Sequence, residues 1–386
     1  MTNITLTPDL LRWARERAGL TEADLAKKLG TQTERVHQWE RSGSLRPAQA
    51  EKISQATHTP LGYLYLDAPP KERLPVPDFR TIGDKELERP SPDLLEIIDI
   101  ALRRQDWLRE HLATGGEDVV PFVGSLYPGA SVEKAAERIR KTMRLDAGSR
   151  SAARTWEEAL QQEVERFEEC GVLVMRTGIV GNNTHRLLDV DEFRGFALSD
   201  SHAPLVFINA QDAKAAQMFT LMHELVHIWL GLSGVSNLQD TYAPNREHER
   251  YCNEVAAEAL VPSAELREVW PAARRRPEPV AAMTRHFKVS SLVILRRLHD
   301  LRFMGWDEFR RRYHEQVKRF QDLKNRQNGG GDFYRNQKTR MSRRFCSALI
   351  ESTLEGRTTY RDALRLMGIV RVDTFHNLAR ELGFGV

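Results

Sequence analysis

Apolar residues recur every three to four positions through much of the chain, which is the spacing of an amphipathic α-helix. Near the N-terminus this spacing predicts three short helices, the first capped at 7–9, the second starting at 21–24 and the third ending near residue 40. Gly19 and Gly30 follow the first two helices, where a helix end is expected. The pattern predicts a compact N-terminal module of short helices.

The middle of the chain mixes helical periodicity with short apolar runs. Helices are predicted over 94–112, 132–143 and 155–169, and three strands over 171–177, 194–200 and 204–209. A longer apolar helix is predicted to open near 211–214 and to end at Leu230, and a further helical stretch covers 247–258. Helices around a small sheet indicate an α+β fold that is mostly helical.

After Pro262 the chain returns to helical periodicity, with predicted helices over 280–287, 290–301 and 306–323 and a last helical module from Ser342 to Val386. Proline-rich residues near 69–90 and the glycines of 328–332 interrupt the pattern. We therefore expect the following division: an N-terminal module over 1–68, a linker over 69–90, a central domain over 91–270, a helical extension over 271–328 and a C-terminal module over 329–386.

Composition narrows the class of protein. A chain of 386 residues with 41% hydrophobic and 29% charged residues is typical of a globular protein with several domains. No apolar run is long enough to span a bilayer, and no secretion signal opens the chain, so we expect no membrane partner and a cytoplasmic location. The three cysteines, at 170, 252 and 346, are far apart and predict neither a disulfide framework nor a cysteine zinc finger.

The net charge of +3 is unevenly distributed. Residues 301–345 contain thirteen Lys or Arg against five Asp or Glu, a local +8 that leaves the rest of the chain near −5. Such a segment either faces a polyanion or is a solvated helix followed by a basic linker. Single-stranded DNA acting as an activator is one hypothesis for it.

The apolar helix over 211–230 carries His223-Glu224-Leu225-Val226-His227. A spacing of four places both imidazoles on one face of the helix, where they can bind one zinc ion. Glu224 projects beside the metal and can accept a proton from bound water. Histidines on a buried helix would be costly without a metal or an ionic partner, so the motif predicts a catalytic Zn²⁺ site.

A catalytic zinc normally has a third protein ligand, and the helix over 247–258 offers candidates. Glu249 and Asn253 are four residues apart, so Glu249 can bind zinc while Asn253 orients a ligand. Glu254 is the rival third ligand, and His248 is a more distant one.

The N-terminal helices predicted at 21–30 and 31–40 have a helix-turn-helix arrangement, whose second helix enters the DNA major groove. The side chains there that can contact bases or phosphates are Gln32, Thr33, Arg35, Gln38 and Arg41. The stretch from Leu20 to Pro47, with Trp39-Glu40-Arg41-Ser42-Gly43, resembles the Xre/Cro family of DNA-binding domains, which implies that the module has five helices. A double-stranded operator is the expected partner. The alternative is a module that binds protein, because Glu34 opposes phosphate attraction.

Residues 74–81 (Leu-Pro-Val-Pro-Asp-Phe-Arg-Thr), the His223–His227 motif and the stretch from Glu249 to Pro262 together resemble the ImmA/IrrE family of zinc metallopeptidases. The resemblance implies a gluzincin-like fold, zinc held by His223, His227 and Glu249, and catalysis by Glu224. It also implies cleavage of an Xre-type repressor, or of a protein encoded nearby, in a stress or mobile-element response. Fused forms also occur beside toxin genes, so the alternative is an antitoxin-like regulator that binds a cognate toxin. A homodimer is a further expected partner state.

The chain departs from this family pattern at three positions. Cys252 replaces a small or aliphatic residue, Val255 replaces an aromatic one, and the bulky Trp229 follows the motif. None of these changes removes a predicted ligand, but oxidation of Cys252 would perturb the site.

Overall fold

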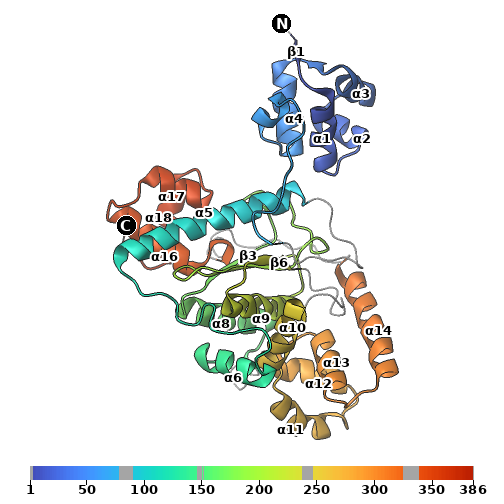
Figure 1. Cartoon of the computed structure of the whole chain (residues 1–386), viewed down its shortest axis with the longest axis vertical. Coiled ribbons are helices and arrows are strands. Elements are labelled where there is room, and N and C mark those ends of the chain that lie inside the picture. Colours follow the sequence, from blue (N-terminus) through green and yellow to red (C-terminus); the bar gives the residue numbers. More distant parts are fainter. Residues whose placement is uncertain are drawn as a thin grey trace. The chain divides into compact units, whose positions relative to one another are not determined.

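We analysed a computed structural model of the chain (Figure 1). The residues that it describes are 3–77, 90–145, 150, 152–236, 247–324 and 339–385, with side chains at 319–324 excluded. Two compact units are present, one comprising Met1–Pro75 and Leu87–Asp99, the other comprising Val76–Glu86 and Ile100–Val386. Parts of the predicted linker and of the basic segment, at 78–89 and 325–338, lie outside the described residues.

The N-terminal module contains four α-helices and one 3-10 helix, which confirms the predicted helical fold. Thr21 caps the second helix with its side chain and Gly30 ends it in the left-handed conformation. Leu25, Val36 and Trp39 enter the shared core. The elements are β1 (Ile4–Thr5), α1 (Pro8–Arg17), α2 (Glu22–Leu29), α3 (Thr33–Ser42), β2 (Ser44–Leu45), α4 (Pro47–Thr57) and η1 (Leu61–Tyr65).

A four-stranded sheet lies at the centre of the larger unit, with the order β3-β5-β4-β6. β3 (Leu173–Thr177) is parallel to β5 (Leu205–Asn209), and β4 (Gly195–Leu198) is antiparallel to it. All three strands are buried along their full length. α8 (Trp156–Glu169) and α9 (Lys214–Leu230) cover one face of the sheet (Figure 1). The sheet therefore backs the helix that carries the histidine motif.

The three strands agree with the prediction, but a fourth, β6 (Gly234–Ser236), was not predicted. Its three residues are too few to show an alternating pattern. β6 pairs with β4 in antiparallel register, with Gly195 opposite Ser236. The Val235 backbone N–H also donates to the Pro77 carbonyl at 3.0 Å, which ties the start of the predicted linker to this strand.

Helices fill the rest of the larger unit. Arg297 forms a buried ion pair with Glu258, and the Glu258 carboxylate also accepts from the Ser263 backbone, which links three helices of this unit. Among the described helices, none has the length and apolar character that a membrane span requires. The remaining helices are α5 (Pro92–Gly115), α6 (Val132–Thr142), α10 (Glu247–Leu260), α11 (Ser263–Ala273), α12 (Pro279–Phe287), α13 (Ser291–Asp300), α14 (Trp306–Lys324), α16 (Arg343–Leu354), α17 (Tyr360–Met367) and α18 (Val372–Glu381).

Candidate metal centre

Helix α9 is buried on all sides over its last three turns and ends at Gly231, which adopts the left-handed conformation. His223 and His227 are 0% and 1% exposed, and their Nε2 atoms lie 3.0 Å apart. The two rings are inclined at 65° with their centroids 4.8 Å apart, so both imidazoles lie on the same side of the helix. The packing of α9 against the sheet therefore fixes two imidazoles in position before any ligand binds.

Glu249, in the first turn of α10, completes this group. Its two carboxylate oxygens lie 3.2 Å from Nε2 of His223 and 3.1 Å from Nε2 of His227. Two atoms bound about 2.05 Å from one tetrahedral zinc ion lie roughly 3.3 Å apart, so these three side chains fit a single zinc ion. Within the part of the chain that the structure describes, His223, His227 and Glu249 are the only such group of metal-binding side chains.

The protonation states of these side chains suit a cation. Burial raises the pKa of Glu249, but the charge and hydrogen bond of His223 and the hydrogen bond of His227 outweigh this and hold the pKa well below its usual range. Burial also lowers the pKa of His227, which favours the neutral imidazole that a metal requires. The site therefore offers one carboxylate and a neutral nitrogen donor without paying for deprotonation.

Glu224 is fully buried, and the Ser236 hydroxyl lies near its carboxylate, although neither carboxylate oxygen makes a hydrogen bond of normal geometry among the described residues. Burial raises its pKa well above the usual value, the charge of Glu249 raises it further, and the Ser236 hydroxyl opposes this only in part. Buried carboxyl groups without partners are rare in proteins and point to a functional role. The unpredicted strand β6 thus contributes Ser236 to the surroundings of Glu224.

The sheet approaches α9 most closely at Gly195 of β4. A Cβ atom at this position would lie 2.6 Å from Cγ2 of Thr220 and 3.1 Å from Cγ of Glu224. Both distances are shorter than normal van der Waals contact, so the close packing beside Glu224 depends on a residue without a side chain.

The structure separates the rival ligands from the metal group. Glu254 is partly exposed and accepts from Arg250 at 2.9 Å, and His248 is exposed. Asn253 lines a neighbouring cleft, where its Oδ1 has no hydrogen-bond partner within the described chain. Cys252, and not Asn253, lies next to an imidazole: its Sγ is 3.8 Å from Nδ1 of His227.

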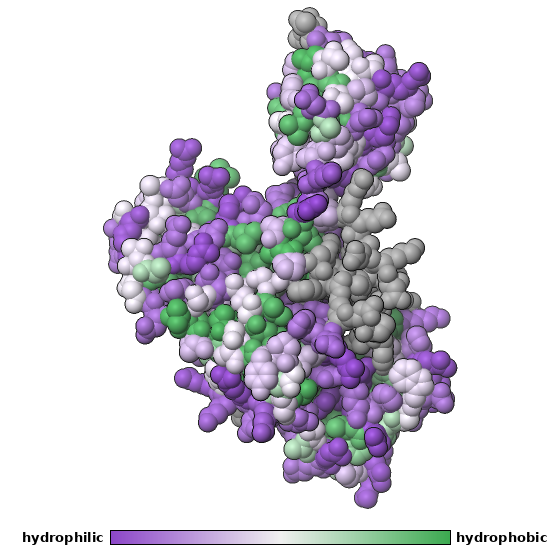
Figure 2. All heavy atoms as spheres, viewed as in Figure 1, coloured by the Kyte–Doolittle hydropathy of each residue, from purple (hydrophilic) through white to green (hydrophobic). Residues whose placement is uncertain are grey.

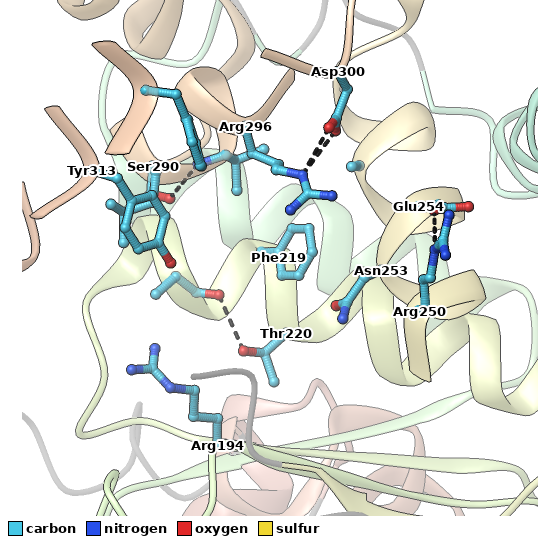
Figure 3. A pocket seen from close by; sticks show the side chains of 15 residues that line it. Arg194, Phe219, Thr220, Arg250, Asn253, Glu254, Ser290, Arg296, Asp300 and Tyr313 are labelled. Carbon is cyan, nitrogen blue, oxygen red and sulfur yellow. Dashed lines mark hydrogen bonds and ion pairs between the residues drawn. The ribbon is translucent and has the colours of Figure 1, made fainter. Parts of the chain in front are cut away.

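A cleft lies between α9, α10, α13 and α14 (Figure 3), and its lining includes Phe219 and Thr220 of α9 but none of the three side chains of the metal group. Aromatic side chains of Phe219, Phe309 and Tyr313 line it, and the Phe219 ring lies 6.4 Å from that of His223. The ion pairs Arg250–Glu254 and Arg296–Asp300 stand at its sides. Sequence reasoning missed α13 and α14 as parts of the site, because only tertiary packing brings them next to the histidine motif.

The N-terminal module presents the predicted DNA-binding side chains as follows. Gln32, Arg35, Gln38 and Arg41 are exposed, and Thr33 is partly buried at the start of α3. The surface on the side of α2 and α3 is hydrophilic (Figure 2). The second helix of the pair therefore has an accessible polar face, as a helix-turn-helix domain requires.

These two sites define a chain that joins a helix-turn-helix module to a candidate metal centre on a buried helix. Residues 11–64 match the family model described as helix-turn-helix, and residues 167–299 match that of the IrrE N-terminal-like domain, a peptidase family. The chain thus carries an Xre-type helix-turn-helix domain followed by an ImmA/IrrE-like peptidase-family domain, and both predicted resemblances are confirmed. Residues 341–381 match a domain of unknown function, DUF8813. Neither a curated protein nor a solved structure matches the chain significantly.

Proposed function

We propose that this protein is a DNA-binding regulator whose IrrE-like domain is a zinc-dependent endopeptidase. The observation that carries the proposal is Glu224, a fully buried carboxyl group that makes no hydrogen bond of normal geometry among the described residues and follows directly on His223, one of three side chains that can hold one metal ion. A metal site that only stabilises the fold needs no general base. Glu224 would therefore be the catalytic residue, with His223, His227 and Glu249 as the zinc ligands.

When bound, zinc supplies Lewis acidity, which polarises the carbonyl of a peptide bond and lowers the pKa of water. Glu224 accepts the proton from the attacking water at a carboxylate oxygen and later donates it to the leaving nitrogen. Burial raises the pKa of Glu224, which favours the protonated form in which the group donates to the leaving nitrogen. His223 and His227 hold their orientation through the packing of α9.

The substrate that the family resemblance suggests is an Xre-type repressor, or a protein encoded by a neighbouring gene, cleaved during stress or the induction of a mobile element. The cleft beside the metal group supports a protein substrate, since Phe219, Phe309 and Tyr313 would accept an apolar side chain near the cleaved bond. The N-terminal domain would bring the peptidase to operators where such repressors are bound.

Glu224→Gln tests the proposal directly. We expect the variant to lose at least about 100-fold in cleavage rate, the lower range for removal of a general base, while zinc content stays unchanged. Purified protein with zinc is incubated with the neighbouring repressor, and cleavage is followed by mass spectrometry. Glu268→Gln, the same substitution at an exposed position of α11 outside the cleft, is the matched control and should cleave normally.

The alternative is an antitoxin-like regulator in which the zinc domain binds a partner without proteolysis. If Glu224→Gln cleaves as fast as the unaltered chain, or leaves every cellular effect unchanged, the peptidase proposal is wrong and this alternative stands.

A further inference from the structure

The C-terminal helices α17 and α18 share helix lengths, caps and buried positions with the helix-turn-helix pair α2 and α3. The first helix of each pair has 8 residues and the second has 10. In both pairs, a threonine caps the first helix: its Oγ1 donates to the aspartate three residues on at 2.6 Å and accepts from that residue's backbone at 3.1 Å. These threonines are Thr21 and Thr359. Left-handed glycines, Gly30 and Gly368, end the first helices.

The packing of the second helix repeats as well. Positions four, seven and eight are buried in both, Val36, Trp39 and Glu40 in α3 and Phe375, Leu378 and Ala379 in α18. Position five is a histidine that contacts the first residue of the first helix. His37 Nδ1 lies 3.3 Å from Oε1 of Glu22, and His376 Nε2 lies 3.2 Å from Oη of Tyr360. Equivalent positions thus meet in both pairs, although the C-terminal turn is one residue longer.

The outward positions of α18 carry the same kinds of side chain as those of α3. Asn377 corresponds to Gln38 and Arg380 to Arg41, and Arg371 precedes the helix where Gln32 precedes α3. Arginine and carboxamide side chains are those that read guanine and adenine in the major groove. Over 339–385 the chain has eight arginines and no lysine against five acidic residues, a net +3, which suits a polyanion.

The module is fixed to the peptidase domain through its other surfaces. Glu168 of α8 accepts from Arg343 N at 2.9 Å and from Ser342 Oγ, and Asn182 Nδ2 donates to the Gly368 carbonyl at 2.6 Å. Arg371 and Arg380 remain exposed, and the visible surface over α17 and α18 is mostly hydrophilic (Figure 2). The docking therefore leaves Arg371 and Arg380 exposed, while Asn377 is partly buried and accepts a hydrogen bond from Arg380 at 2.9 Å.

We propose that α17 and α18 form a second helix-turn-helix, which binds double-stranded DNA with α18 in the major groove. The charge and residue types of the outward face favour DNA over a protein partner, although Val370 in the turn is 91% exposed. Together with the N-terminal domain, the chain then carries two DNA-reading helices and recognises a bipartite site. This inference does not depend on peptidase activity.

Selection of duplexes from a random-sequence pool by the full chain tests the proposal. We expect a two-part sequence for the unaltered chain. Arg35→Ala/Gln38→Ala should lose one part, and Asn377→Ala/Arg380→Ala should lose the other and bind the selected duplex at least about tenfold more weakly, the cost of one or more lost base contacts. Arg357→Ala, which removes an exposed arginine outside the helix pair, is the matched control and should bind normally.

Arg371→Glu provides a second variant in case the double substitution unfolds the module, because Arg371 is exposed and its side chain makes no capping bond. The unfolding midpoint of each variant is measured alongside binding. The proposal is overturned if folded Arg371→Glu and Asn377→Ala/Arg380→Ala select the same sequences with unchanged affinity. It is equally overturned if they leave DNA binding intact but dissociate a dimer in sedimentation, which would make α18 a protein-docking helix.

Discussion

Helices α9 and α10 both contribute to the metal group, but their surroundings differ. α9 is enclosed by the sheet, α8 and α10, so that His223, Glu224 and His227 are at most 1% exposed. α10 has a solvent side, where Arg250 and Glu254 pair, and the Glu249 side chain is 17% exposed. In the proposed site, one helix would therefore supply a rigid pair of ligands and the base, whereas the other would supply a single ligand from near the surface.

This difference indicates how the site divides its tasks. Substitutions on α9 disturb metal binding and the core together, because the same helix packs the sheet. The effect of a substitution on α10 depends on the face that it changes. A change on the inward face should alter metal binding, whereas a change on the solvent-facing side should leave metal binding almost unaltered. Four expected outcomes test this division.

The largest effect is expected for His227→Ala. Loss of an imidazole ligand should weaken zinc binding by more than about 100-fold, the upper range for loss of an outer hydrogen-bonding partner. Zinc affinity is measured by competition with a chelator, and proteolysis is followed in parallel. Retention of one tightly bound zinc per chain would show that the ion lies elsewhere.

The next effect distinguishes the two faces of α10. Glu249→Gln removes the carboxylate charge that faces both imidazoles, so zinc affinity should fall about 10- to 100-fold. Glu254→Gln changes the same chemical group on the outward face and should leave the affinity within about twofold, since exposed ion pairs contribute little. The same competition assay serves both variants. The reverse order of effects would make Glu254 the third ligand.

Gly195→Ala tests how tightly the sheet holds α9. The added methyl group would meet Thr220 and the Phe207 carbonyl at 2.6 and 2.8 Å, so we expect a loss of about 1–3 kcal/mol in the free energy of unfolding. Gly305→Ala, where nothing lies within 4 Å of the new Cβ, is the control. Urea unfolding measures both. Equal free energies of unfolding for the two variants would mean that β4 and α9 can move apart to accommodate the methyl group at little cost.

Cys252→Ala should have the smallest effect. The thiol is a weak hydrogen-bonding group 3.8 Å from His227, so its loss should change zinc affinity only about two- to fivefold, below the range for strong outer partners. Cys346→Ala, another buried cysteine outside the site, controls for lost packing. A drop as large as that of Glu249→Gln would show that Cys252 orients the imidazole.

The sequence predicted α9 well because its apolar residues, its histidine spacing and Gly231 all indicate the same helix. It predicted less about α10, where Glu249 and Glu254 are both chemically suited to be the third zinc ligand. The rotation of that helix, which its packing against α6 and α9 sets, turns Glu249 and not Glu254 toward the histidines and so supports Glu249 as the proposed ligand. The same rotation places Cys252 beside His227, where we had expected Asn253 to orient a ligand.

Other features had no local signal. β6 is three residues long, and the cleft depends on helices α13 and α14, which follow the motif by more than sixty residues. The helical character of 342–386 was predicted, but its likeness to the N-terminal pair was not. That likeness consists of helix caps, buried positions and one histidine contact. Because few of the equivalent residues are identical, the sequence alone did not show it.

The three metal-binding side chains also join parts of the chain that are 22 residues apart, from His227 to Glu249. A bound ion is therefore a cross-link between α9 and α10, and its binding free energy adds to the stability of the folded domain. At a free zinc concentration about 1,000 times the dissociation constant, this addition is roughly 4 kcal/mol. The supply of zinc in the cell would then govern the lifetime of the regulator as well as its chemistry.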